Sequence, residues 1–232
     1  RDVEGIENLA QILGTILEKG VPNFFGYQRF GSRRAVSHLI GRALVKRRFN
    51  EAVDLLLTYT TDGESAEVQR VRKMLSEDAL KVDAADLPPT LDLEKLVLRS
   101  LKKHSNDYIK VVRSMPLRVR RLFLNAYQSY IFNRTLSLAV EDGLDLSSIQ
   151  YSDLYAEVSE IRMLDVKRAD RKIESNRSMK VVLQCPLVGY EFKEEYFGRL
   201  GRYASKALEE EEVSPRSFYI DDMPELLSLI HI

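Results

Sequence analysis

The chain has 232 residues, of which 44% are hydrophobic and 30% are charged, and its 35 basic and 35 acidic residues give no net charge. This balance is typical of a folded globular protein and excludes disorder of the whole chain. No apolar run reaches the roughly 18 residues that a membrane span needs, and the N-terminal residues lack the apolar core of a signal peptide. A single cysteine, Cys185, and three widely separated histidines predict neither an internal disulfide nor a metal site.

The chain begins with a helical pattern. Apolar residues recur at helical spacing between residues 6 and 17, and Gly20 directly after Lys19 predicts the end of this helix. Pro22 and two glycines then predict a loop over residues 21–31.

Several further helices follow this loop. Ser32 is a candidate N-cap for a helix that extends to Val45, and Asn50 is a candidate cap for a short helix after it. Helical spacing returns in residues 64–80 and 93–103.

The longest predicted helix starts near Pro116, which suits a first turn, and ends near Gly143. After it the pattern becomes less regular. Residues 154–166 are ambiguous, residues 180–185 predict a buried strand, and residues 199–212 return to helix. The sequence therefore predicts an α+β fold that is predominantly helical and has a small sheet in its C-terminal third.

Charged residues are segregated along the chain. Residues 27–48 contain seven basic residues and no acidic one, and residues 99–121 contain eight basic residues against Asp107. Residues 191–225 carry ten acidic and five basic residues. A phosphate backbone is the partner that two basic regions favour, because each neutralised phosphate releases counterions. The alternative is that these regions are ordinary solvated helix faces.

The loop over residues 21–31 is unusually aromatic, with Phe24, Phe25 and Phe30 beside Arg29. One interpretation is that these rings fill a core beneath a helix junction. The other is that arginine and aromatic side chains together stack on bases and contact phosphates.

Residues 20–31, Gly-Val-Pro-Asn-Phe-Phe-Gly-Tyr-Gln-Arg-Phe-Gly, closely resemble the signature Gly-Val-Pro-Asn-Tyr-Phe-Gly-x-Gln-Arg-Phe-Gly of the TruD family of tRNA pseudouridine synthases. Residues 33–41 and 125–133 are similar to the family's next helix and to its second helical signature. Residues 186–190 and 223–228 resemble the corresponding segments of archaeal or eukaryotic members of the family. The resemblance therefore covers most of the chain.

This resemblance implies an activity and a substrate site. The family isomerises a uridine of tRNA, usually at position 13, from an N-glycosidic to a C-glycosidic link, without a metal or an organic cofactor. Enzymes of this kind take the base out of its stack and hold it against other side chains. Carried over to this sequence, Phe25 stacks on the uracil, Asn23 holds the catalytic loop by hydrogen bonding, and Arg29 keeps the turn in shape together with Gln28 and Gly31. Asn23, Phe25 and Arg29 are thus the predicted substrate-binding residues.

The sequence also departs from the family pattern. The family's aspartate lies in a Gly-x-Lys-Asp-Lys-like motif upstream of the loop, and this chain contains no such motif. We therefore predict no catalytic residue within the chain, a nucleophilic aspartate before Arg1, and an inactive isolated chain. After Ser228 the family continues Gly-Thr-Arg-Arg, whereas this chain ends Leu-Ile-His-Ile. We expect an internal piece of a longer isomerase, with residues 1–48 from the catalytic core, residues 49–225 forming the helical TruD insertion domain with its small sheet, and residues 226–232 a truncated return to the core.

The expected partner is tRNA, without a membrane or a small-molecule cofactor, and the expected place of action is the cytoplasm, or the nucleus in a eukaryote. The candidate RNA-binding residues are Arg33, Arg34, Lys102, Lys103, Arg118 and Arg121. Structural pairing is an equal alternative for Arg29, Arg33 and Arg34. His38 is predicted to be a structural histidine rather than an acid or base.

Two other functions stay open. A noncatalytic RNA-binding domain related to this family would bind tRNA without isomerising it. A helical protein-interaction module would have no affinity for tRNA.

Overall fold

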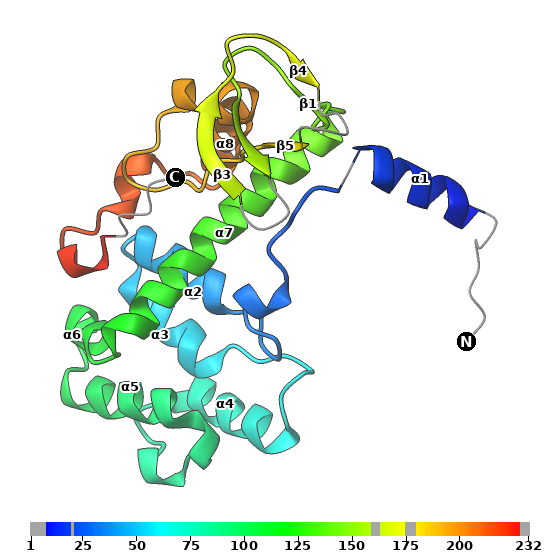
Figure 1. The fold of residues 1–232 in the computed structure, drawn as a ribbon. Coiled ribbons are helices and arrows are strands. Elements are labelled where there is room, and N and C mark those ends of the chain that lie inside the picture. Colours follow the sequence, from blue (N-terminus) through cyan, green and yellow to red (C-terminus); the bar gives the residue numbers. More distant parts are fainter. Residues whose placement is uncertain (1–7, 20, 159–162, 175–179, 228–232) are drawn as a thin grey trace. The chain divides into compact units, whose positions relative to one another are not determined.

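The computed structural model describes residues 8–19, 21–158, 163–174 and 180–227 (Figure 1). The chain forms two compact units. The first unit comprises Arg1–Phe24, Phe132–Pro186 and Lys193–Ala207, and the second unit comprises Phe25–Ile131, Leu187–Phe192 and Leu208–Ile232. These divisions differ from the expected domain boundaries at residues 48 and 225, which stay a prediction. Two expectations, the capping Gly20 and the divergent last residues 228–232, lie outside the described part of the chain.

The second unit is built from helices. They are α2 (Ser37–Val45), α3 (Phe49–Thr58), α4 (Ala66–Asp78), α5 (Asp92–Lys103), α6 (Tyr108–Arg113) and the first part of α7 (Leu117–Glu141), with short 3-10 helices η2 (Tyr27–Arg29), η3 (Ala84–Asp86), η4 (Pro89–Leu91), η6 (Pro215–Phe218) and η7 (Pro224–Leu226). The apolar residues that gave these segments their helical spacing are buried, among them Ile40, Leu44, Leu56, Leu57 and Leu98. The core of this unit is therefore the shared apolar face of its helices.

Helix α2 crosses α7 at a glycine. A Cβ atom on Gly41 would overlap the carbonyl oxygen of Phe123 and press on the Tyr127 side chain. The absent side chain lets the two helix backbones approach closely, which fixes α2 against the part of α7 that carries Tyr127.

Helix α2 begins later than the sequence predicted. Ser32 is not its N-cap, because the helix starts at Ser37 and Val36 is the N-cap residue. Gly31 has a φ of 114°, and a Cβ there would overlap the carbonyl oxygen of Arg34. The chain thus makes a tight turn at residues 31–35 before a helix can form.

Asn50 is not a cap either, because α3 starts at Phe49 and Arg48 is its N-cap residue. The other predicted helices are confirmed to within a few residues. Helix α4 starts after Ser65, whose hydroxyl accepts a hydrogen bond from the Val68 amide at 3.4 Å. Helices α5 and α7 span most of the predicted ranges, and Gly143 follows α7 with a φ of 71°. Helix α6 was not predicted, since its six residues are too few for a periodic pattern.

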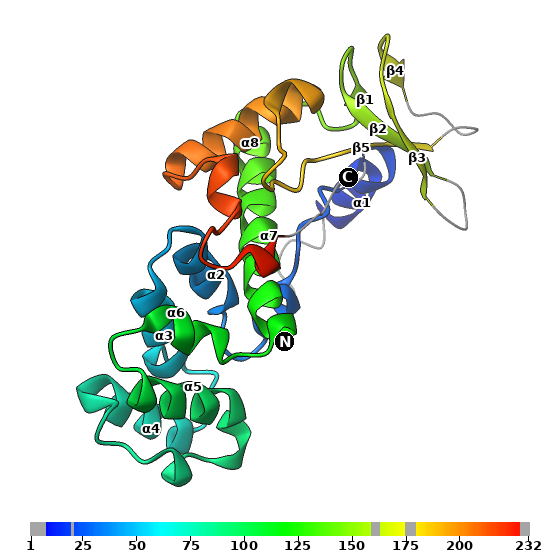
Figure 2. The ribbon, with the colours of Figure 1, turned by 90° about the vertical axis from the view of Figure 1, so that its left-hand side faces the viewer.

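The first unit contains the sheet. Strands β1 (Ser148–Ile149) and β4 (Ile173–Glu174) form one antiparallel pair, and β2 (Leu154–Val158) lies between β3 (Met163–Arg168) and β5 (Lys180–Leu183) in an antiparallel three-stranded sheet (Figure 2). Ile149, Tyr155 and Ala169 form the buried cluster beside it. The predominantly helical α+β class with a small sheet is therefore confirmed.

A buried ion pair ties helix α8 (Gly198–Glu210) to the turn before β2. The Asp153 side chain is fully buried and accepts hydrogen bonds from Arg199 Nε at 2.9 Å and Nη2 at 2.7 Å. The Gln150 amide donates to the same carboxylate at 2.8 Å. Each polar atom of this pair is satisfied, which is the condition under which a buried ion pair is tolerated.

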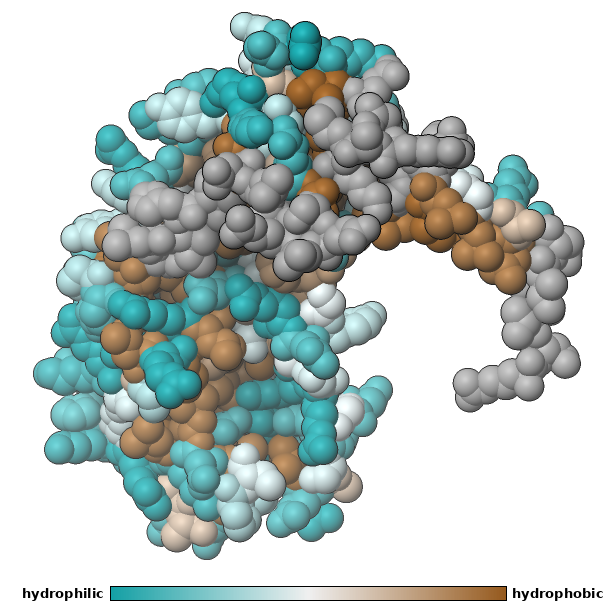
Figure 3. All heavy atoms as spheres, viewed as in Figure 1, coloured by the Kyte–Doolittle hydropathy of each residue, from teal (hydrophilic) through white to brown (hydrophobic). Residues whose placement is uncertain are grey.

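Helix α1 (Leu9–Lys19) carries an exposed apolar stripe. Leu9, Ile12, Leu13, Ile16 and Leu17 are 39–87% exposed, and Figure 3 shows apolar side chains along this helix. Despite this stripe, none of the helices in the described ranges combines the length and apolarity needed to cross a membrane.

Candidate nucleic-acid interface

The aromatic loop folds around the short helix η2. The Arg29 amide donates to the Gly26 carbonyl at 3.0 Å, and the amides of Phe30 and Gly31 donate to the Tyr27 carbonyl, also at 3.0 Å. Tyr27 is 82% exposed and Phe24 is 43% exposed, whereas Phe25 is half-buried. The loop therefore presents aromatic side chains to solvent from a hydrogen-bonded turn.

Arg29 supports the Phe25 ring. Its guanidinium lies 5.4 Å from the ring centroid, a cation–π distance. Arg29 Nε also donates to Ser129 Oγ at 2.8 Å, and Ser129 Oγ donates to the Asn125 carbonyl one turn earlier in α7 at 2.9 Å. The guanidinium is thus held by α7 and in turn holds one ring of the loop, an arrangement suited to a stacking platform.

Asn23, the remaining predicted substrate residue, is exposed and belongs to the first unit. Ser129 was not among the predicted site residues. Its stretch of α7 resembled the second family signature, but no sequence pattern indicates a contact between side chains 100 positions apart.

His38 lies between two aromatic rings. The ring centroid of Phe30 is 5.2 Å away in an edge arrangement, and that of Tyr130 is 5.4 Å away in a stacked one. Burial lowers the pKa of His38, the Glu211 carboxylate opposes the shift, and Arg42 adds to it. Within the described residues, its buried Nδ1 has no hydrogen-bond partner. These contacts agree with the structural role expected for His38.

Glu211 bonds to two tyrosines of α7 and to an arginine of α2. Its carboxylate accepts hydrogen bonds from the hydroxyls of Tyr127 at 3.1 Å and Tyr130 at 3.3 Å, and it pairs with Arg42 Nε at 2.9 Å. Burial, reinforced by this carboxylate, raises the pKa of Tyr127. The cluster fixes the rings of α7 that pack beside His38.

Arg34 lies in a buried network of four charges. Its Nη1 donates to the carbonyls of Leu56 at 2.9 Å and Tyr59 at 3.0 Å, and its Nη2 pairs with Glu94 at 3.2 Å. Arg72 contacts the same Glu94 at 2.9 Å and also pairs with Glu64 at 2.9 Å. The Arg34 guanidinium is committed to structural pairing, so we do not carry it forward as an RNA contact. The Arg33 side chain is exposed.

The basic residues of α5 to α7 fall into two groups. Lys102, Lys103 and Arg118 are exposed, and within the described part of the chain none of them has an ion pair. Arg120 is 7% exposed and pairs with Glu225 at 2.6 Å, and Arg121 donates to the Glu225 carbonyl at 2.9 Å. The exposed group is the one free to meet phosphates.

A family model described as tRNA pseudouridine synthase D (TruD) matches residues 1–229. The chain therefore belongs to the TruD family. A relative from Methanopyrus kandleri is 34% identical over 95% of this chain and 50% of its own length, and one from Thermococcus gammatolerans is 39% identical over 68% of this chain and 38% of its own length. Both are provisionally named tRNA pseudouridine synthase D.

A crystal structure from Methanosarcina mazei, provisionally named tRNA pseudouridine synthase D, has the same fold. It aligns with a TM-score of 0.79 and 29% identity, covering 98% of this chain and 55% of the other. The chain thus spans about half the length of the relatives that it matches.

Proposed function

We propose that the complete protein isomerises a uridine of tRNA to pseudouridine, at position 13, and that this chain supplies part of its grip on the substrate. The observation that carries the proposal is the loop of residues 20–31, in which Arg29 supports Phe25, inside a chain that belongs to the TruD family. The proposed place of action is the cytoplasm.

The proposed chemistry breaks the bond between N1 of uracil and C1′ of the ribose and forms a bond between C5 and C1′. C5 loses its proton to solvent, and N1 takes up a proton, so that the product is an isomer of uridine. The base must leave its stack and turn, so it needs a flat apolar surface that holds it without fixing one orientation. We assign this role to Phe25, and we assign to Asn23 the task of holding the loop by hydrogen bonding. The nucleophilic aspartate is proposed to lie outside this chain.

For the RNA backbone we propose Arg33, Lys102, Lys103 and Arg118. These side chains are exposed, and each can neutralise a phosphate. Arg121 is a weaker candidate because one of its nitrogens already bonds a backbone carbonyl.

The reaction is tested by tritium release from tRNA that carries 5-tritiated uridine, because loss of the C5 proton accompanies isomerisation. We expect release by the complete protein and none by the 232-residue chain alone. Release by the chain alone would place the nucleophile within it. Binding of tRNA by the complete protein without release would instead favour a noncatalytic RNA-binding protein.

The stacking role is tested by Phe25→Ala in the complete protein, with Phe24→Ala as the matched control. Stacking on an aromatic side chain contributes about 1–3 kcal/mol per base, so we expect the rate of tritium release to fall by about 10- to 100-fold in Phe25→Ala. Affinity for tRNA should change less than the rate, because Phe25 is proposed to contact only the flipped base and the rest of the RNA contacts remain. A normal rate in Phe25→Ala would end this assignment.

The backbone contacts are tested by charge reversal. Lys102→Glu, Lys103→Glu and Arg118→Glu should each weaken tRNA binding and lower the slope of log affinity against log salt by about one. Arg202→Glu, which makes the same charge change at an exposed position of α8, is the control. Equal slopes in all four variants would rule out this surface.

A further inference from the structure

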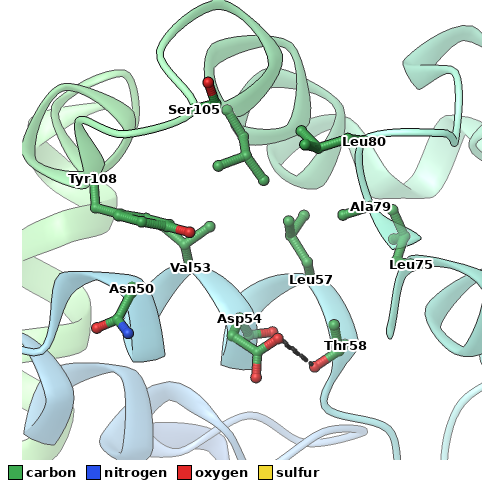
Figure 4. Close-up of a pocket in the computed structure, with 11 residues that line it drawn as sticks. Asn50, Val53, Asp54, Leu57, Thr58, Leu75, Ala79, Leu80, Ser105 and Tyr108 are labelled. Carbon is green, nitrogen blue, oxygen red and sulfur yellow. Dashed lines mark hydrogen bonds between the residues drawn. The ribbon is translucent and has the colours of Figure 1, made fainter. Parts of the chain in front are cut away.

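A pocket opens between helices α3, α4 and α5 and the start of α6, away from the aromatic loop in sequence (Figure 4). Its volume is about 210 Å³. An apolar cavity of about 150 Å³ is enough to hold a benzene ring, so this pocket has room for a single flat ring system. None of the residues assigned to uridine binding or to phosphate contacts lines it.

The floor of the pocket is apolar and its wall is aromatic. Val53, Leu57 and Leu75 are each 2% exposed and form part of the floor. The Tyr108 ring reaches into the opening from the start of α6 (Figure 4). A flat apolar floor beside an aromatic ring suits a base that has left its stack.

Two polar side chains lie at the edge of the same opening. Asp54 and Asn50 lie one turn apart on α3, and both are exposed (Figure 4). Asp54 is the one carboxylate among the residues that line the pocket, and its Oδ1 accepts a 3.4 Å hydrogen bond from the Thr58 hydroxyl. The second oxygen, Oδ2, has no ion pair within the described residues.

Two basic residues are close to the pocket in sequence. Lys102 and Lys103 directly follow Leu101, which lines it, and both are exposed at the end of α5. A ring that carries a phosphate is the kind of ligand that an apolar pocket near exposed lysines favours. This combination is that of a nucleotide within an RNA strand.

We propose that this pocket binds a guanine of the RNA substrate. A carboxylate can only accept hydrogen bonds, and guanine offers two adjacent donors, N1–H and the N2 amino group, on its Watson–Crick edge. Adenine, cytosine and uracil each offer a donor from one position on that edge. Asp54 takes the two donors, the Asn50 amide faces the O6 acceptor, and Tyr108 stacks on the ring. The assignment rests on the proposed function, because it takes RNA as the partner.

The test measures binding of the complete protein to fluorescent five-nucleotide RNAs of uridine with guanosine, adenosine, cytidine or inosine at the centre. We expect the guanosine RNA to bind about tenfold more tightly than the others, since a bidentate contact discriminates bases by that order. Inosine lacks the N2 amino group and should bind like adenosine. Asp54→Asn should abolish the preference, whereas Asp86→Asn, an exposed residue that loses the same charge, should keep it.

Equal binding of all four RNAs, no binding of any, or a preference that survives in Asp54→Asn would each overturn the pocket assignment. Tritium release and tRNA binding are measured in the same preparation. If the wild-type protein shows neither, the proposed function fails. If it shows both but no guanine preference that depends on Asp54, only the pocket assignment fails.

Discussion

His38 is held neutral by its surroundings, because its imidazole lies between Phe30 and Tyr130 and burial lowers its pKa. The unfolded chain binds the same proton with an ordinary pKa of about 6.5. Above that pH the two states bind equal numbers of protons at this site. As the pH falls from about 6.5 through the folded pKa, the unfolded state binds more protons and the folded state loses stability.

We therefore predict that the pKa of His38, followed by the NMR shift of its ring protons, lies below 6.5. We also predict that urea unfolding of His38→Gln lacks the loss of stability that the wild type shows below this pH. His104→Gln is the comparison, as it removes a histidine from the end of α5. A folded His38 that titrates at or above 6.5 would show that Glu211 outweighs burial.

The role of a single residue was predictable from sequence where its partners are nearby in the chain, and not where they are far away. The loop residues Phe25 and Arg29 could be chosen from sequence, because their motif is contiguous. Their support from Ser129 could not, since it depends on how α7 packs. Nor could the sequence separate Arg33, which is exposed, from its neighbour Arg34, which is buried among carboxylates.

At the scale of elements, the Arg72 guanidinium connects helices of the second unit at the end of α3. The carbonyls of Leu56 and Leu57 in the last turn of α3 accept hydrogen bonds from Arg72 at 2.9 and 3.1 Å. These carbonyls have no partner within the helix itself. Arg72 thereby caps the last turn of α3. Through its ion pairs with Glu64 and Glu94 it connects α3, α4 and α5.

We predict that Arg72→Met destabilises the protein by about 3–5 kcal/mol, because it leaves two buried carboxylates short of a partner. Lys81→Met breaks the ion pair between Lys81 and Asp78, in which the Lys81 side chain is 84% exposed. This change should alter stability by less than about 1 kcal/mol. Chemical denaturation of both variants measures the difference. Similar midpoints for the two variants would mean that the network of four charges makes no net contribution to stability.

The boundaries of elements were predictable where the signal is local. Gly143 after α7 is recognisable because a left-handed glycine that ends a helix acts within a few positions. Ser32 had the same chemistry as a cap, yet the helix begins at Ser37. The local turn at Gly31, with its φ of 114°, delays the helix, and the Thr61 hydroxyl also holds this turn by donating to the Arg33 carbonyl at 2.8 Å.

For the whole molecule, local sums of charge overstate the basic surface. Residues 99–121 looked strongly basic, but Arg113, Arg120 and Arg121 all bond to residues 222–225 of the acidic C-terminal region. Basic side chains of this region are thus engaged by residues that are far away in sequence within the second unit. Under the proposed function, the residues of this region that remain for phosphate contacts are the exposed Lys102, Lys103 and Arg118. Reversal of any one of them should therefore have a larger effect than the sequence sums suggest.

The apolar stripe of α1 leads to a last prediction. Leu13 and Leu17 are 48% and 87% exposed on one face of the helix. Large exposed apolar patches promote association, so the isolated 232-residue chain should self-associate as its concentration rises. Leu13→Lys combined with Leu17→Lys should reduce this association in sedimentation velocity. Gln11→Lys combined with Thr15→Lys adds the same charge to other exposed positions of α1 and should reduce it less. If both double variants sediment alike, net charge rather than the apolar stripe governs association.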